Sequence, residues 1–444
     1  MTAEIAIMNR GSIALAADSA VTLQRPGGAK IYNSVNKLFM LSKYRPVGVM
    51  VYGQAEFIGV PWETIIKEYR KRLGMESFPS LCDYVKHFLN FLAPDSGLFS
   101  QEERDRYFHR SVGTCFVGIK DRINKEVKKF IGDKGGITQG QVSNTCTAVV
   151  KATWTSYEKA ETLPCFQTLS LKALVSKYQP VIEKIRKAVF ENLPLSSSAE
   201  KLLSNIAISL FLKDRFVGPI SGVVIAGFGE SEHFPSLVSV LVDGFLDDQL
   251  RQKEDRNQTI SAKNSAAIIP FAQSEMVHTF MEGIDPYYHR FLGGYLGGFF
   301  EKLPLEIADG LRALRSKAKG KLTERLKASC MKLLEELNKQ SDTYRRDNHV
   351  TPIIEAVTFL PKDELAAMAE SLVNLTSFKR RISMDAETVG GPIDVAVISK
   401  GDGFIWIKRK HYFEPKLNPA FFANYYMDRK PAEEGEQDAQ GIKN

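Results

Sequence analysis

The chain has 444 residues, 44% of them hydrophobic, so it is long enough to bury a substantial core over two or three structural units. Its formal charge of +7, from 59 basic and 52 acidic residues, is a mild excess for this length, so the chain is not a polycationic protein. Nucleic acid or an acidic partner is permitted but not required. The chain lacks a charged-then-apolar signal segment and an apolar run of about 18 residues, which predicts a cytoplasmic protein.

A hairpin is predicted at the start of the chain, where the runs TAEIAIM and SIALAA flank Asn9-Arg10-Gly11. A three-residue loop that ends in glycine, at a position with positive φ, is a common hairpin connection. With Arg10 at the tip, residues whose numbers sum to about 20 face each other, and Thr2 lies opposite Asp18.

A second hairpin is predicted from NKLFMLS and VGVMVYG, which flank a turn at Lys43-Tyr44-Arg45-Pro46. Pairing across this loop brings Lys37 level with Tyr52 and Gly53. The two hairpins therefore predict two residue pairs at strand ends, Thr2 with Asp18 and Lys37 with Gly53.

These four residues suit nucleophilic chemistry if they meet. A free N-terminal threonine carries a hydroxyl nucleophile and its own general base, because an α-amino group titrates near ~7.7–8.0. Lys37 would supply positive charge, Asp18 would orient the lysine or the amine, and the Gly53 N–H would stabilise an oxyanion. A structural alternative stays open, in which Asp18 and Lys37 form an ordinary ion pair and Gly53 ends a strand.

The spacing from Thr2 through Gly11 to Asp18 and Thr22, followed by Asn36-Lys37-Leu38 and Tyr52-Gly53, resembles the proteasome β-subunit and bacterial HslV-like family of N-terminal-nucleophile (Ntn) hydrolases. The resemblance implies a four-layer αββα sandwich of the α+β class and a nucleophile exposed by removal of Met1. It gives Thr2 the place of the nucleophile, Asp18 and Lys37 those of the charged pair, Gly53 that of the oxyanion amide, and Thr22 that of a substrate-binding residue.

Later segments also resemble the family. A helix is expected over AEFIGVPWETIIKEYRKRL, core strands at 221–228 and in PSLVSVLVDG, a turn and helix in PFAQSEMVHTFMEGI, and a closing hairpin in VGGPIDVAVISKGDGFIWIKRK with its turn at Gly401-Asp402-Gly403.

The sequence departs from the family pattern at supporting positions. The serine expected before the paired glycines is Val389, and the aspartate expected three residues earlier is Ala386, with Asp385 and Glu387 beside it. Asp385 and Glu387 are either a substitute acid pair or a solvated loop. Ser274 is a further supporting candidate, and an arginine that often follows the Asp18 position is Ala20.

The matched core is divided by insertions. We expect core segments at 1–97, 216–285 and 361–427, an insertion of mixed helix and strand at 98–215, a helical, basic insertion at 286–360, and a disordered tail at 428–444. The first insertion contains a predicted strand pair, TCFVGI and TCTAVVKA, and a helix in KYQPVIEKIRKAVFENL. The second carries seven Lys or Arg against one Glu over 311–327, either a solvated helix face or a contact for nucleic acid, headgroups or an acidic partner.

The remaining signals predict no cofactor and no metal. The seven histidines form neither H-x-x-x-H nor H-E-x-x-H, and Gly390-Gly391 lacks the rest of a phosphate-binding loop. An odd number of cysteines without C-x-x-C spacing indicates reduced thiols, mostly in the core: Cys82, Cys115, Cys146, Cys165 and Cys330.

Three functions follow as hypotheses. The first is a threonine hydrolase that acts on peptides or proteins, assembles as a homo-oligomer and has an ATPase or other protein as a possible partner. The second is an inactive scaffold of the same fold that binds a protein or nucleic acid through its basic insertion. The third is a small-molecule amidase with the same mechanism.

Overall fold

The computed structural model describes residues 2–25, 28–216, 218, 220–311, 316–383 and 389–426. It is a mixed α+β structure with two five-stranded antiparallel sheets, which confirms the predicted class at that level. The first sheet has the order β12-β1-β2-β13-β14, from strands Ala266–Ala272, Ala3–Asn9, Ser12–Ala17, Asp394–Ser399 and Gly403–Lys408. The first and last parts of the chain thus share one sheet.

The second sheet has the order β11-β10-β9-β6-β5. Its strands are Gln249–Thr259, Ser236–Leu246, Ser221–Gly227, Val47–Gly53 and Leu38–Met40. The predicted strands in PSLVSVLVDG and at 221–228 are confirmed as β10 and β9, and the closing hairpin is confirmed as β13–β14.

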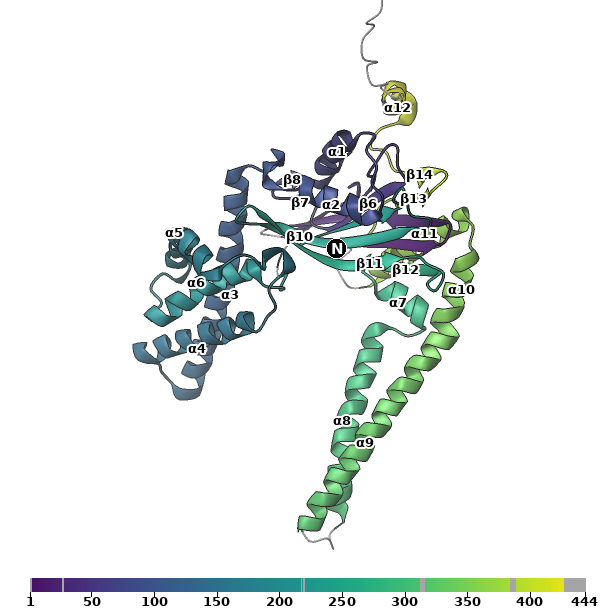
Figure 1. Cartoon of the computed structure of the whole chain (residues 1–444). Helices are drawn as coiled ribbons and strands as arrows, with labels where there is room; N and C mark the ends of the chain where they lie inside the picture. The colour runs from purple at the N-terminus through teal and green to yellow at the C-terminus, as the bar shows by residue number, and fades with distance from the viewer. Residues whose placement is uncertain are drawn as a thin grey trace, which may run out of the picture.

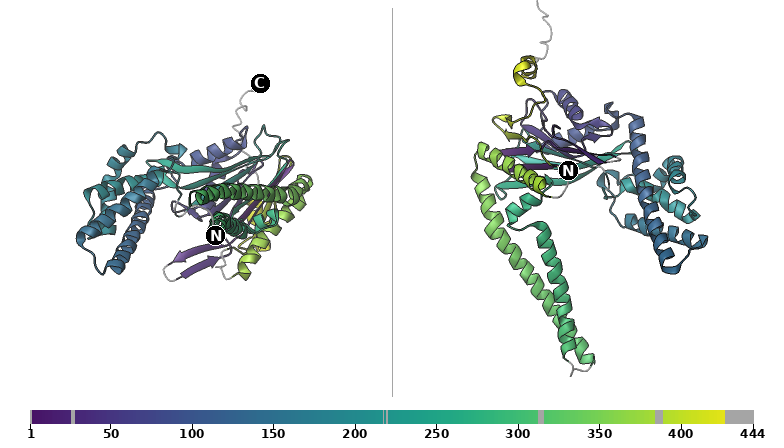
Figure 2. Two further views of the ribbon diagram at one scale, coloured as in Figure 1. Left: turned by 90° about the horizontal axis from the view of Figure 1, so that it is seen from below. Right: turned by 180° about the vertical axis from the view of Figure 1, so that it is seen from behind.

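The sheets pack face to face, and helices cover both outer faces (Figures 1 and 2). Alternation along β1 explains this, because successive side chains of a strand point to opposite faces. Ala6 and Met8 pack between the sheets, whereas Ile5 and Ile7 pack against helices on the other side. Those helices include α7 (Glu275–Glu282), α10 (Thr351–Phe359) and α11 (Lys362–Ile382).

The outer face of the second sheet is covered by α1 (Trp62–Leu73) and α2 (Leu81–Phe91). The predicted helix is confirmed from Trp62 onward, whereas its expected first residues, 55–61, contain a short hairpin instead, with Ile58 at a positive φ in its turn. Five residues at helical spacing fix α1 on the sheet: Trp62, Ile65, Ile66, Tyr69 and Leu73. The α2 helix begins with a capping box, in which Ser80 Oγ accepts from Asp83 N and Asp83 Oδ2 accepts from Ser80 N.

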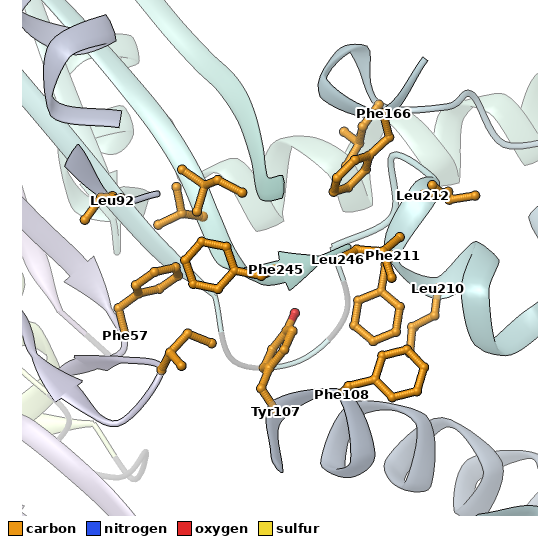
Figure 3. Packing of buried hydrophobic residues seen from close by; sticks show 14 of the residues in the cluster. Phe57, Leu92, Tyr107, Phe108, Phe166, Leu210, Phe211, Leu212, Phe245 and Leu246 are labelled. Carbon is orange, nitrogen blue, oxygen red and sulfur yellow. The ribbon is translucent and has the colours of Figure 1, made fainter. Parts of the chain in front are cut away.

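The first insertion folds as four long helices beside the sheets (Figure 1). They are α3 (Gln101–Lys134), α4 (Gln139–Glu158), α5 (Leu171–Phe190) and α6 (Ser197–Leu212). Their buried residues join the core of the second sheet, and Figure 3 shows the junction, where Tyr107, Phe211 and Phe245 lie close to one another. The helix predicted in KYQPVIEKIRKAVFENL is confirmed as part of α5.

The strand pair predicted in TCFVGI and TCTAVVKA is wrong, because both segments lie inside helices α3 and α4. The aromatic and β-branched residues that favour a strand have helical spacing over a longer window. In α3 the buried residues Val112, Phe116, Ile119 and Ile123 lie on one helical face.

The second insertion is an antiparallel helical pair that extends away from the sheets (Figures 1 and 2). It consists of α8 (Pro286–Gly310) and α9 (Ser316–Arg345), followed by one π-helical turn at 346–350. Within the described helices, none combines the length and apolar character that crossing a membrane requires. The predicted disordered tail at 428–444 lies outside the described residues.

The structure also contains two small hairpins, β3–β4 (Val21–Arg25, Gly28–Tyr32) and β7–β8 (Glu56–Phe57, Val60–Pro61), the helix α12 (Pro419–Tyr426) and short 3-10 turns. All five cysteines are free; Cys146 and Cys330 are buried, and the other three are half-buried.

Candidate active site

The first hairpin determines where Asp18 lies. Glu4 pairs with Ala17 and Met8 with Ile13, so facing residue numbers sum to 21 and not to the expected 20. The loop has two residues, because the Asn9 Oδ1 atom accepts from the N–H groups of Gly11 (3.0 Å) and Ser12 (3.1 Å) and closes the turn early. The expected positive φ at Gly11 is also wrong. Asp18 therefore follows the end of β2, where its N–H donates to the Ala3 carbonyl at 3.1 Å.

The Asp18 carboxylate connects three separate segments. Its side chain is fully buried, and Oδ1 accepts from Lys37 Nζ at 2.6 Å and from Ala3 N at 3.1 Å. Oδ2 accepts from Ala20 N at 3.2 Å and from Gly390 N at 3.0 Å. Four donors compensate the desolvation of this carboxylate, and they hold the N-terminal strand, Lys37 and the segment before β13 in fixed positions.

Lys37 comes from the second sheet, just before β5. Its carbonyl accepts from Val51 N at 2.9 Å, so Lys37 lies opposite Val51. The prediction that Lys37 lies opposite Tyr52 and Gly53 is wrong. The difference arises because Leu38 pairs with Met50 and Leu41 N donates to the Val47 carbonyl, so the loop covers 42–46 and is one residue longer than the predicted turn. The Lys37 side chain is 4% exposed, and its ammonium group forms the ion pair with Asp18 between the two sheets.

Thr2 lies at the wall of a cavity of about 220 Å³ that Lys37 and Gly53 also line. Thr2 is 4% exposed, and its carbonyl accepts from Gln273 N at 3.0 Å, which fixes the start of β1 beside β12. Val51, Trp62 and the loop at 54–56 complete much of the wall. The structure thus brings Thr2, Lys37 and Gly53 to one cavity, with Asp18 directly behind Lys37.

Gly53 ends β6 with a φ of +89°, which L side chains rarely adopt. A Cβ atom at this position would lie 2.1 Å from the Ile220 carbonyl oxygen. Only glycine therefore lets β6 approach the segment before β9 this closely while turning into the cavity wall.

We expect Gly53→Ala to lower the free energy of unfolding by at least about 2 kcal/mol, because it adds a backbone clash to an unfavourable φ. Gly97→Ala is the matched control: Gly97 has a φ of +76°, and a Cβ added there would have no atom within 4 Å, so this variant measures the φ cost alone. Urea unfolding of both variants checks this. Equal losses for the two variants would contradict the clash.

Glu4 is a buried acid that the sequence analysis did not single out. It is 2% exposed, and neither carboxyl oxygen has a hydrogen-bond partner among the described residues. Burial raises the pKa of Glu4 to about 8; Lys37 lowers it and Asp18 raises it further. Glu4 has the same parity as Ala6 and Met8, so its side chain lies between the sheets, close to the ion pair.

A second buried ion pair, Lys410–Asp394, lies near the first. Asp394 begins β13 and pairs with Ala17, and its Oδ1 atom accepts from Lys410 N at 2.9 Å. Burial lowers the pKa of Lys410, while Asp394 raises it, and Lys37 and Asp18 also contribute. The charges of the two pairs cancel, so an ionised Glu4 would add an uncompensated negative charge to this region.

The other predicted residues lie farther from this geometry. Thr22 is in β3, where its backbone pairs with Ile31. Ser274 is the residue before α7, and its side chain makes no cap hydrogen bond. Asp385 lies outside the described residues.

Val389 is fully buried among the apolar residues under α11 and supplies no polar group. A different serine connects this segment to the site: Ser19 Oγ donates to the Pro392 carbonyl, and Ser19 N donates to the Gly390 carbonyl at 3.1 Å. The sequence signal for this role was the Asp18-Ser19 pair at the end of an apolar strand.

Within the described part of the chain, no group of three or more His, Cys, Asp or Glu side chains is arranged to hold a metal ion. The cavity wall offers a hydroxyl, an ammonium group and strand-end amides, and behind it lie the Asp18 carboxylate and the buried Glu4 acid with its raised pKa. Comparison with known proteins finds no family model and no curated protein that matches this chain.

Proposed function

We propose that the protein is a proteasome-like threonine hydrolase of the Ntn class, a peptidase whose nucleophile is Thr2 after removal of Met1. One observation carries the proposal: the buried Asp18–Lys37 pair stands behind a cavity whose wall includes Thr2 and Gly53. A lone ion pair at a sheet end would not need a cavity with a hydroxyl and a glycine amide beside it.

The fold supports the same proposal. Two antiparallel sheets lie face to face between helical layers, which agrees with the αββα sandwich that the resemblance implies. Thr2 precedes the first strand of one sheet, whereas Lys37 and Gly53 belong to the other, so the proposed site lies where the two sheets meet.

The proposed reaction uses the groups in the cavity. The Thr2 Oγ atom attacks the substrate carbonyl carbon, and its proton passes to the neutral α-amine. The Lys37 ammonium favours the ionised hydroxyl, and the Gly53 N–H stabilises the oxyanion. The C–N bond then breaks, the leaving amine takes the proton from the Thr2 ammonium, and water hydrolyses the ester with the same amine as base.

The substrate and assembly follow from the same proposal. Peptides or unfolded proteins are the proposed substrates, in the cytoplasm, with a homo-oligomer that shelters the site and an ATPase or other protein as a possible partner. No cofactor or metal takes part in the proposed reaction. A small-molecule amidase would share every step and differ only in the substrate.

Intact mass measurement tests the proposal. The purified protein is expected to lack Met1 and to gain one probe mass from a peptide epoxyketone or β-lactone, which reacts with an N-terminal threonine. Thr2→Ala is expected to gain none, and Thr2→Ser, which keeps a hydroxyl and the amine, is expected to retain labelling. A retained Met1 would block the amine and contradict the hydrolase proposal.

A second function, an inactive scaffold, is favoured by one observation. Val389 is apolar and buried where the family has a supporting serine. In this alternative the basic part of α9, where Lys317, Lys321 and Lys327 are exposed, binds an acidic protein or a nucleic acid. Loss of Met1 without any labelling would favour the scaffold over the hydrolase.

A further inference from the structure

A larger cavity lies in the helical unit, away from Thr2. Its volume is about 460 Å³, and its walls come from α3, α4, the end of α6 and the following segment. Tyr157, Leu210 and Phe211 supply apolar surface, and Figure 3 shows Leu210, Phe211 and Tyr107 at this junction. A volume of this size suits a small organic ligand.

Three arginines line this cavity without a carboxylate partner. Arg110 and Arg122 project from α3, and Arg215 follows α6. Among the described residues, none of the three forms an ion pair with an Asp or Glu. Arg215 donates to Ser156 Oγ and lies 4.9 Å from the centre of the Tyr157 ring, which fixes its guanidinium at the wall.

The one carboxylate in the wall is already neutralised. Asp243 Oδ2 accepts from Arg251 Nη1, and both side chains are less than a tenth exposed. Arg251 also donates to the carbonyls of Phe211 (2.7 Å), Lys213 and Arg215 (both 3.0 Å), so four of its five N–H groups are engaged by the protein. The cavity therefore keeps the positive charge of Arg110, Arg122 and Arg215 uncompensated.

Two of these guanidinium groups lie near Cys115, which is on the α3 wall of the cavity. Burial raises the pKa of the Cys115 thiol, and the hydrogen bond with Tyr157 and the charges of Arg122 and Arg215 act against that rise. Positive charges from α3 and from the segment after α6 thus face the same part of the cavity, and arginines placed in this way bind anionic groups by charge-assisted hydrogen bonds.

We propose that this cavity binds an organic anion, with a carboxylate or phosphate group held by Arg122 and Arg215 and an apolar body against Tyr157, Leu210 and Phe211. This site does not depend on the proposed hydrolase activity. A cavity of about 320 Å³ adjoins it through shared wall residues Tyr107, Arg110 and Asp243 and reaches Gln54 and Glu56, which also line the Thr2 cavity. The anion is therefore either a free small molecule or the acidic end of a longer chain.

Calorimetric titration of the full chain tests the site with 3-phenylpropionate as the anionic probe, its neutral amide as the isostere and inorganic phosphate as an anion without an apolar body. We expect saturable binding of 3-phenylpropionate, with the amide and phosphate each weaker. Arg122→Ala and Arg215→Ala are each expected to weaken the binding of 3-phenylpropionate by about tenfold or more, since each removes a charged hydrogen-bond donor. Lys128→Ala, an exposed cation of α3 outside the cavity wall, is the matched control and is expected to change nothing.

Equal binding of the acid and the amide would overturn the proposal, as would the absence of binding by any anionic probe at millimolar concentration or arginine variants that bind like the control. Competition distinguishes the two sources of the anion. A hexapeptide with a free C-terminal carboxylate that displaces 3-phenylpropionate, while its C-terminal amide does not, identifies the end of a longer chain. Binding of 3-phenylpropionate that neither peptide displaces identifies a free small molecule.

Discussion

Replacement of Lys37 by methionine is expected to lower the free energy of unfolding by about 3–5 kcal/mol, because it leaves the fully buried Asp18 carboxylate without its counter-ion. The three backbone donors of Ala3, Ala20 and Gly390 remain but carry no net charge. Methionine fills a similar volume, so a cavity contributes little to the loss. Urea or thermal unfolding measures it.

The matched control is Lys67→Met. Lys67 forms an ion pair with Glu63 at 2.5 Å, but both side chains are well exposed, at 53% and 39%. Removing it is expected to cost less than about 1 kcal/mol, because solvent screens an exposed pair. If Lys37→Met were as mild as Lys67→Met, the Asp18–Lys37 pair would be no more than a surface-type contact.

The same variant also tests the role of Lys37 in the proposed reaction. If the Lys37 charge stabilises the ionised Thr2 hydroxyl, then labelling of Thr2 by a β-lactone is expected to slow by about 100- to 1,000-fold in Lys37→Met. Lys67→Met is expected to react at the wild-type rate. Unchanged labelling in a folded Lys37→Met protein would remove Lys37 from the mechanism.

Glu4→Gln is expected to make the protein more stable at alkaline pH and to flatten the dependence of stability on pH. The pKa of Glu4 is raised from 4.5 to about 8, so between these values the folded state holds a proton that the unfolded state releases. The contribution of Glu4 to the free energy of unfolding is therefore at its full value below pH 4.5, falls as pH rises, and is lost once pH exceeds about 8. The slope reaches about 1.4 kcal/mol per pH unit at most.

Free energies of unfolding between about pH 5 and 8 check this dependence. The wild type is expected to lose stability across the interval, and Glu4→Gln is expected to lose several kcal/mol less, since a neutral amide carries no charge to desolvate. Glu102→Gln is the control for replacing a carboxylate by an amide at an exposed position, because the Glu102 side chain on α3 is 82% exposed. Parallel curves for the wild type and Glu4→Gln would show that Glu4 is ionised across the interval.

Much of the α+β core was accessible from short-range patterns. The strands at 221–228 and 236–246, the helix from Trp62 and the closing hairpin each carry a local signal, either a period of two or a period near 3.6 between turn residues. The meeting of Thr2, Lys37 and Gly53 at one cavity follows from two hairpins and the packing of the two sheets. The hairpins were predictable, although each register was off by one or two residues.

The register errors have a local cause that spacing does not reveal. The Asn9 side chain closes the first loop by accepting two backbone N–H groups, and nothing in the count of residues distinguishes this from a three-residue loop. The other contacts of the site join residues far apart in the sequence, so local sequence patterns do not predict them. Lys410 meets Asp394 only because β13 and the segment after β14 adjoin, and Ser19 meets Pro392 across most of the chain.

Glu4 was overlooked, although the sequence pattern is sufficient to identify it. It is the sole acidic residue in TAEIAIM, and its parity places it on the inter-sheet face with Ala6 and Met8. A carboxylate at such a position is expensive to bury, so it predicts either a partner or a raised pKa. The structure has the raised pKa.

The hydrogen bond from Gly390 N to Asp18 joins residues 372 positions apart, and it sets an order of events during synthesis. A ribosome adds roughly 5–20 residues per second, so Asp18 waits roughly 20–80 s for this partner. Until then β2 has β1 beside it but lacks β13 on its other edge. The nascent chain therefore carries an unpaired strand edge and an incomplete carboxylate site until translation nears its end, so a chain truncated before Gly390 would be both aggregation-prone and unable to assemble the Thr2 region.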